Sequence, residues 1–166
     1  MPRKAVYAGS FDPPTYGHMY MIQEGSQLFD ELVVAVGVNP DKQTSFDVET
    51  RLRLLEQVTE GLANVTISSF TNKFLIRHAS TIGARYILRG VRNETDFGYE
   101  RTMRHVNEDL QRGITTVFLI PPRHLAETSS SFVKGLVGPE GWREVVKGFV
   151  PAPVYAELLR QHEGET

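Results

Sequence analysis

The fold is decided by residues 5–28, which read AVYAGSFDPPTYGHMYMIQEGSQL. Residues 5–8 form a short apolar run of the kind that makes a buried strand, and residues 9–14 are rich in turn-forming residues. Thr15 is a favourable N-cap residue, and the apolar residues after it are spaced as on one face of a helix. We therefore predict a strand, a loop and a helix in direct succession.

The same pattern recurs along the rest of the chain. The run at 32–36, LVVAV, is continuously apolar, as in a strand that is covered on both faces. Further strands are predicted at 65–67, 86–88 and 116–120. Helices are predicted between them: a second capped by Asp47, a third capped by Asn72 and ending near Gly83, and a charged fourth from about Thr95 to Arg112. Two short helices are predicted at 142–147 and 154–161.

Four strand–helix repeats followed by a fifth strand predict an α/β fold, a doubly wound sheet of five parallel strands with helices on both faces. The length of 166 residues fits a single domain over 1–166, with a core at 1–137 and a C-terminal helical segment at 138–166. In open parallel sheets, ligands bind at the carboxyl ends of the strands, where helix N-termini point. We therefore expect the site in the loops that follow the strands.

Composition excludes several classes of protein. With 18 Lys and Arg against 20 Asp and Glu, the net charge of −2 lacks the basic excess expected for binding to nucleic acid or a membrane surface. The absence of cysteine excludes disulfides and thiolate metal sites, and the five histidines lack metal-ligand spacing. The N-terminal apolar run is too short for a signal peptide, and no run is long enough for a membrane helix. A cytoplasmic protein is expected.

The loop after the first predicted strand carries polar groups suited to a phosphate. Ser10 offers a hydroxyl at the end of the strand, and Gly17 and His18 fall in the first turn of the following helix, where free N–H groups favour an anion. The alternative is that Gly17 eases packing and His18 is a partly buried histidine with its own hydrogen-bond partners.

Cations and hydroxyls recur in later loops. Arg89 and Arg92 provide two planar donors suited to phosphate, and Lys42 is a third cation at the same edge of the sheet. The alternative for the arginines is ion pairing with acids of the next helix, namely Glu94, Asp96 or Glu100. The serines at 129–131 either cap a helix or form a neutral anion-binding turn.

The missing motifs narrow the chemistry. No Walker lysine motif or GxGxxG fingerprint follows the first strand, and no GxSxG elbow is present. What remains is a set of groups for holding phosphates. Such a site suits phosphoryl or nucleotidyl transfer, because these reactions are catalysed mainly by positioning and charge stabilisation.

In sequence order, the motifs resemble one family. The segment GSFDPPTYGH at 9–18 resembles the T/HxGH motif of the nucleotidyltransferases. Its spacing to Lys42, to RGVR at 89–92, to DFGYE at 96–100 and to the serines at 129–131 is similar to that of the phosphopantetheine adenylyltransferases, over residues 5 to about 134.

The resemblance implies a Rossmann-like fold, transfer of AMP from ATP to 4′-phosphopantetheine in coenzyme A synthesis, Mg²⁺ that arrives with ATP, and a homohexamer. It implies that His18 stabilises the transition state. It assigns the phosphopantetheine contacts to Ser10, Lys42, Leu75 and Arg89. It assigns the ATP contacts to Ser10, Phe11, His18, Gly90, Val91, Arg92, Glu100, Ser129, Ser130 and Ser131.

Residues 125–128, LAET, depart from the aromatic and apolar run usual before the serines of that family. We expect Glu127 to bring a negative charge near the polyphosphate. Two alternative functions are a nicotinate mononucleotide adenylyltransferase, which generally carries His in place of Thr15, and a catalytically silent nucleotide-binding module. A cytidylyltransferase fits less well for the same reasons.

Overall fold

The central sheet of the computed structural model, which describes residues 1–164, is built from five parallel strands in the order β3-β2-β1-β4-β5. The strands are β1 (Lys4–Gly9), β2 (Glu31–Val38), β3 (Val65–Thr71), β4 (Tyr86–Gly90) and β5 (Thr115–Leu119). The chain moves outward from β1 in one direction and then returns to β4 on its other side. The switch point of this doubly wound α/β sheet therefore lies between β1 and β4, where such folds bind ligands.

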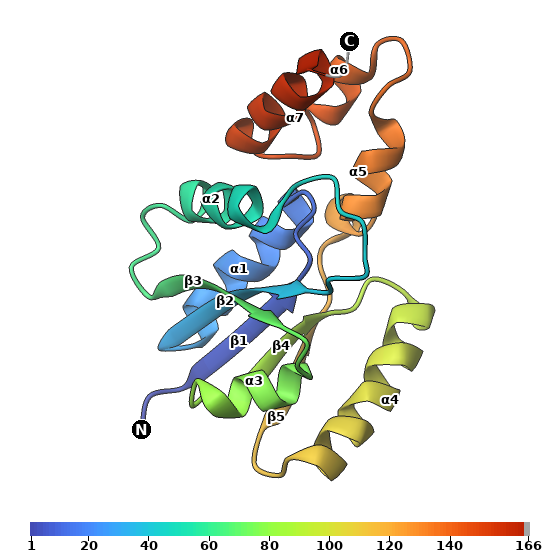
Figure 1. Ribbon diagram of the computed structural model, residues 1–166. Helices are drawn as coiled ribbons and strands as arrows, with labels where there is room; N and C mark the ends of the chain where they lie inside the picture. The colour runs from blue at the N-terminus through green and yellow to red at the C-terminus, as the bar shows by residue number, and fades with distance from the viewer. Residues whose placement is uncertain (165–166) are drawn as a thin grey trace.

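Helices cover both faces of the sheet (Figure 1). Successive residues of a strand point to opposite faces. Ala5 and Tyr7 of β1 pack toward α1 and α2, whereas Val6 and Ala8 pack toward α3 and the end of α4. These helices are α1 (Tyr16–Leu28), α2 (Val48–Val58), α3 (Leu75–Thr81) and α4 (Glu94–Leu110).

The C-terminal part of the chain adds a third apolar cluster. It consists of a short 3-10 helix η1 (Arg123–Leu125), α5 (Ser130–Leu136), α6 (Trp142–Val146) and α7 (Ala152–Gly164). Trp142, Val154 and Leu158 are buried there against Phe46 and Leu54, so these last helices pack against α2 and the linker before it (Figure 1). The two predicted short helices are present, and the second extends further in both directions than predicted.

Helix starts follow the capping residues that the sequence predicts, with one exception. The side chains of Thr15 and Asp47 cap α1 and α2. Asn72 does not cap α3, because β3 continues to Thr71 and Asn72 is used in the turn that leaves the strand, with a left-handed φ of 50°. The N-cap position of α3 is Phe74, which makes no side-chain hydrogen bond.

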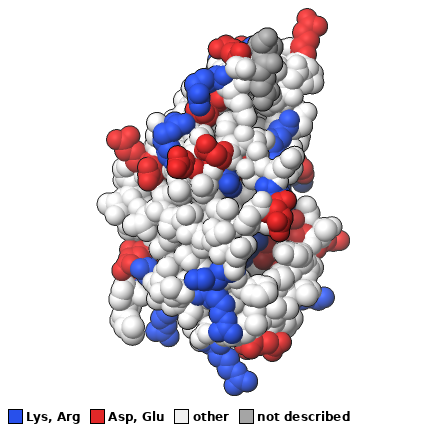
Figure 2. Space-filling view, in the orientation of Figure 1, with Lys and Arg blue, Asp and Glu red and all other residues white. Residues whose placement is uncertain are grey.

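Charged side chains of both signs are interspersed over the face seen in Figure 2, in keeping with the nearly balanced composition. None of the helices within residues 1–164 combines the length and the apolar character needed to cross a membrane.

Candidate active site

A cavity of about 350 Å³ lies at the carboxyl ends of β1 and β4, at the switch point of the sheet. It brings together six of the predicted site residues: Ser10, His18, Arg89, Gly90, Arg92 and Ser129. Gly17, Leu125 and Thr128, which the sequence analysis also considered, line it as well. Residues that the sequence analysis did not single out complete the lining: Tyr7, Ala8, Gly9, Met21 and Pro121. The strand residues among them gave no signal, because an apolar strand does not show which of its ends will face a ligand.

His18 is oriented by its role in capping α1. Thr15 is the N-cap residue, and its main-chain N–H donates to His18 Nδ1 at 3.0 Å. The Thr15 hydroxyl donates its single proton to the carbonyl of Thr128 at 2.6 Å, so it cannot also donate to the imidazole. Nδ1 is therefore the acceptor nitrogen, and Nε2 is the nitrogen that carries the proton.

His18 is also held neutral. Burial, followed by the positive charge of Arg92, lowers the pKa of its imidazole to about 4. Its ring packs edge-on against Phe11, with the ring centroids 4.9 Å apart. Phe11 is buried beneath the cavity in a left-handed conformation, with φ 47°, which costs free energy for a residue with a Cβ atom. His18 thus offers a fixed, neutral hydrogen-bond donor.

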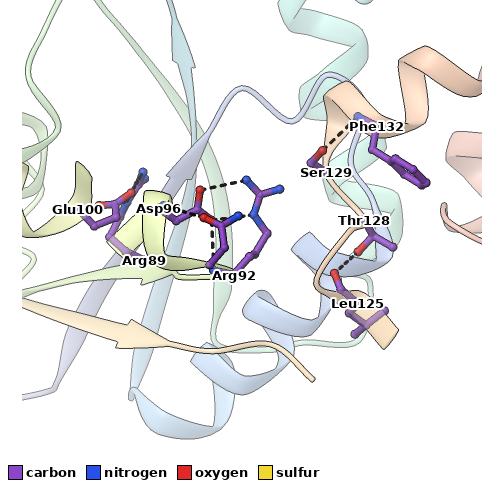
Figure 3. Close-up of polar contacts among 9 residues, drawn as sticks. Arg89, Arg92, Asp96, Glu100, Leu125, Thr128, Ser129 and Phe132 are labelled. Carbon is purple, nitrogen blue, oxygen red and sulfur yellow. Dashed lines mark hydrogen bonds and ion pairs between the residues drawn. The ribbon is translucent and has the colours of Figure 1, made fainter. Parts of the chain in front are cut away.

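Each site arginine is paired with a carboxylate of α4 (Figure 3). Arg89 Nε donates to both Glu100 carboxylate oxygens at 2.9 and 3.0 Å, and Arg92 Nε donates to Asp96 at 2.9 Å. This is the arrangement considered in the sequence analysis as the alternative to phosphate binding. It accounts for how two arginines remain close together at the sheet edge while both line the cavity.

The segment before α5 is locked onto the start of α1. A Cβ atom on Gly17 would lie 2.6 Å from Thr128 Oγ1 and 2.9 Å from the Thr128 carbonyl oxygen, so the contact requires glycine. Thr128 is buried and its hydroxyl donates to the Leu125 carbonyl at 2.6 Å (Figure 3). Glu127 is exposed beside it. The hydrogen bond that Arg92 donates to Asp96 and the charge of Asp96 raise the pKa of Arg92, and the charge of Glu127 adds to this.

The three serines have different surroundings. Ser129 is the N-cap of α5 and accepts from Phe132 N–H at 3.1 Å, which confirms capping for one of them (Figure 3). The Ser130 hydroxyl donates to the Pro13 carbonyl at 2.7 Å, and Ser131 is exposed in the first turn of α5.

The remaining predicted residues do not line the main cavity. Leu75 lines a smaller cavity of about 140 Å³ under α4, together with Glu100 and Arg89, and Arg89 therefore stands between the two hollows. Lys42 is exposed in the loop after β2, and Val91 is buried behind the arginines. Residues 1–164 contain no cluster of three or more His, Asp or Glu side chains placed to hold a metal ion.

Comparison with known proteins places the chain in a family. Residues 6–135 match the family model described as cytidylyltransferase-like. The phosphopantetheine adenylyltransferase of Chromobacterium violaceum is 53% identical over 160 residues, covering 96% of this chain and 98% of the relative. That of Neisseria meningitidis serogroup C is 51% identical over 164 residues, covering 99% and 96%.

A solved structure supports the fold alone. Plasmodium falciparum nicotinic acid mononucleotide adenylyltransferase, solved as a complex with APC, superposes with a TM-score of 0.74 at 13% identity, covering 98% of this chain and 96% of that one. The family model and the near full-length sequence matches show that the chain belongs to the cytidylyltransferase-like family and, within it, to the phosphopantetheine adenylyltransferases.

Proposed function

We propose that this protein transfers the adenylyl group of ATP to 4′-phosphopantetheine, giving dephospho-CoA and pyrophosphate. The observation that carries the proposal is that Ser10, His18, Arg89 and Arg92 converge in one cavity at the switch point. The chain is also more than half identical to a phosphopantetheine adenylyltransferase. An oxygen of the acceptor phosphate forms a bond to the α-phosphorus of ATP while the bond from that phosphorus to the bridging oxygen of pyrophosphate breaks.

The nucleophile is already an anion, so no general base is needed. The work of the site is to bring two polyanions together and to stabilise the charge that grows on the α-phosphate. His18 Nε2–H is suited to donate to an oxygen of the α-phosphate, because the ring is fixed by Thr15 and does not change its charge near neutral pH.

The acceptor is assigned to the side of the site around Arg89. Ser10, Lys42 and Arg89 would hold its phosphate, and Leu75 would contact the pantetheine arm in the smaller cavity that Arg89 also lines. Arg89 then exchanges its pairing with Glu100 for one with phosphate, an exchange between two anionic partners of matching geometry.

ATP is assigned to the side of the site around Arg92 and the segment before α5. Arg92, Ser10, Phe11, His18 and Ser129 would contact it, together with Gly90, Val91, Glu100, Ser130 and Ser131. Mg²⁺ is proposed to enter as the Mg–ATP substrate, as the resemblance to the family implies. No step is therefore assigned to a metal ion held by the protein.

Two further features of the family are proposed for this chain: assembly as a homohexamer and a place in the cytoplasm. Large apolar side chains are exposed on and near α4, namely Phe74, Phe97, Tyr99 and Ile120, which supports association through that side. Light scattering on the purified protein tests the assembly, and a monomeric mass would refute it.

Pyrophosphate release tests the function. Purified protein with Mg–ATP is offered 4′-phosphopantetheine and nicotinate mononucleotide in parallel, with each substrate omitted in turn as a control. Release with phosphopantetheine alone is expected. Release only with nicotinate mononucleotide would reassign the acceptor, and ATP binding without release in either reaction would make the protein a nucleotide-binding module.

A further inference from the structure

Asp12 is a buried acid in the loop between β1 and α1, and none of the roles above uses it. Its side chain is only 3% exposed. A carboxylate in this place needs an explanation, because a negative charge close to a site for two polyanions repels them unless it is compensated.

The Asp12 carboxylate joins three segments of the chain. It accepts hydrogen bonds from Ser45 N–H at 2.9 Å and from Phe46 N–H at 2.8 Å, both in the linker that connects β2 with α2. It also accepts from Lys134 Nζ of α5 at 3.2 Å. The lysine supplies the compensating charge, and the two main-chain donors fix the carboxylate's direction.

Each joined segment carries residues that the proposed function assigns to a substrate. Ser10 lies two positions before Asp12, Lys42 lies in the linker that Ser45 and Phe46 close, and the serines at 129–131 begin the helix that carries Lys134. The relative positions of acceptor ligands and ATP ligands therefore depend on one buried side chain.

The other side of the same loop is held in a similar way. Arg51 of α2 is buried, and its Nη1 donates to the Ser10 carbonyl oxygen at 2.9 Å. The loop thus has little freedom to adjust if the Asp12 contacts are lost on one side only.

We propose that Asp12 is a positioning residue of the transfer reaction, which holds the loops carrying Ser10 and Lys42 and the start of α5 in register, with Lys134 neutralising its charge. This inference rests on the proposed function. Its contribution is geometric: the acceptor phosphate is aligned with the α-phosphate only while the junction is intact, and misplacement by about 1 Å can cost roughly 100-fold in rate.

The test compares Asp12→Asn with Glu157→Gln in steady-state kinetics at a temperature where circular dichroism shows both variants folded. Glu157 is also a buried acid, paired with Arg53 and Arg160, but it ties α7 to α2 and touches none of the substrate loops. It therefore controls for the loss of a buried ion pair as such.

For Asp12→Asn we expect kcat/KM for phosphopantetheine to fall by roughly 10–100-fold, with a higher KM for the acceptor and a lower kcat. Glu157→Gln is expected to leave both constants unchanged. Equal kinetics in the two variants would overturn the inference, whereas a wild-type protein that releases no pyrophosphate with phosphopantetheine would instead refute the proposed function.

If Asp12→Asn does not fold, Lys134→Met decides. Lys134 is partly exposed, so its replacement is expected to destabilise the fold less than that of Asp12, yet it leaves the charge of the buried Asp12 carboxylate uncompensated. We expect kcat/KM for phosphopantetheine to fall roughly tenfold in this variant. Wild-type kinetics in Lys134→Met would then overturn the inference.

Discussion

In the proposed reaction, His18 acts through one hydrogen atom, that on Nε2, because the contact with Thr15 leaves Nδ1 as an acceptor. The His18→Ala variant lacks the donor that is proposed to face the charge developing on the α-phosphate. We expect its kcat to fall by roughly 10²–10³-fold with the fold retained. Steady-state kinetics and circular dichroism check this, with His105→Ala, an exposed histidine of α4, as the matched control. Turnover like that of the wild type in His18→Ala would remove His18 from the mechanism.

The low pKa of His18 also predicts a pH dependence of stability. In the unfolded chain the imidazole takes up a proton near its ordinary pKa of 6.5, whereas the folded protein does so only near pH 4. Below pH 6.5 the unfolded state therefore binds more protons, and the free energy of unfolding falls as the pH drops from 6.5 to 4. This contribution to stability is complete above pH 6.5.

Urea unfolding at pH 7.5 and pH 5 measures this effect. The wild type is expected to lose more stability than His18→Ala over that interval, because only the wild type contains the imidazole that resists protonation when folded. An equal loss in both proteins would mean that His18 titrates normally in the folded state.

Lys42 is an exposed cation, so its removal should affect binding without affecting the fold. We expect Lys42→Ala to raise the dissociation constant for phosphopantetheine roughly 10–100-fold, the scale of one charge-assisted hydrogen bond, and to change ATP binding little. Calorimetry with each substrate measures both constants, and Lys147→Ala, an exposed lysine beyond α6, is the control. A larger effect on ATP would move Lys42 to the nucleotide side.

At the scale of elements, the start of α1 and the segment before α5 form one unit. Gly17→Ala would place a methyl group 2.6 Å from Thr128 Oγ1, so the 125–129 segment must move. Overpacking of this kind lowers the free energy of unfolding by about 1–3 kcal/mol. We therefore expect Gly17→Ala to show a higher KM for ATP and a lower melting temperature. Gly98→Ala on α4 is the control, because a Cβ atom there meets nothing within 4 Å. It is expected neither to raise the KM for ATP nor to lower the melting temperature.

The same unit explains the unusual residues before the serines. Thr128 lines the cavity and is otherwise buried. Its hydroxyl donates to the Leu125 carbonyl, and its own carbonyl accepts from the Thr15 hydroxyl. Unchanged ATP kinetics in Gly17→Ala would show that this contact does not position the segment.

At the scale of the whole molecule, the C-terminal helices stabilise the domain that carries the site. Leu158 of α7 is 5% exposed in the cluster that includes Phe46 and Val133, residues of the linker and of α5. Leu158→Ala is expected to lower the free energy of unfolding by about 2–5 kcal/mol, because it leaves a cavity in a packed cluster. Urea titration measures this change. Leu28 is 41% exposed, so Leu28→Ala should lower the free energy of unfolding much less.

The sequence alone was enough to predict the order of strands and helices, the all-parallel sheet and the family. These follow from local signals: apolar runs such as 32–36, capping residues such as Thr15 and Asp47, and motifs such as GSFDPPTYGH. The family and its function are confirmed by the near full-length relatives, whereas the roles of individual site residues stay predictions.

Tertiary structure decided which groups face one another. The choice of Glu100 for Arg89 and of Asp96 for Arg92 among the acids of α4 was decided by packing. So were the bond from Thr15 to Thr128, which leaves His18 Nδ1 as an acceptor, and the three-way junction at Asp12. Local sequence fixes where a strand ends or a helix begins. Hydrogen-bond partners up to 122 residues apart depend on how those elements pack. This is why the sequence could name the polar residues of the site and a set of candidate acids for its arginines, but not which partner each residue takes.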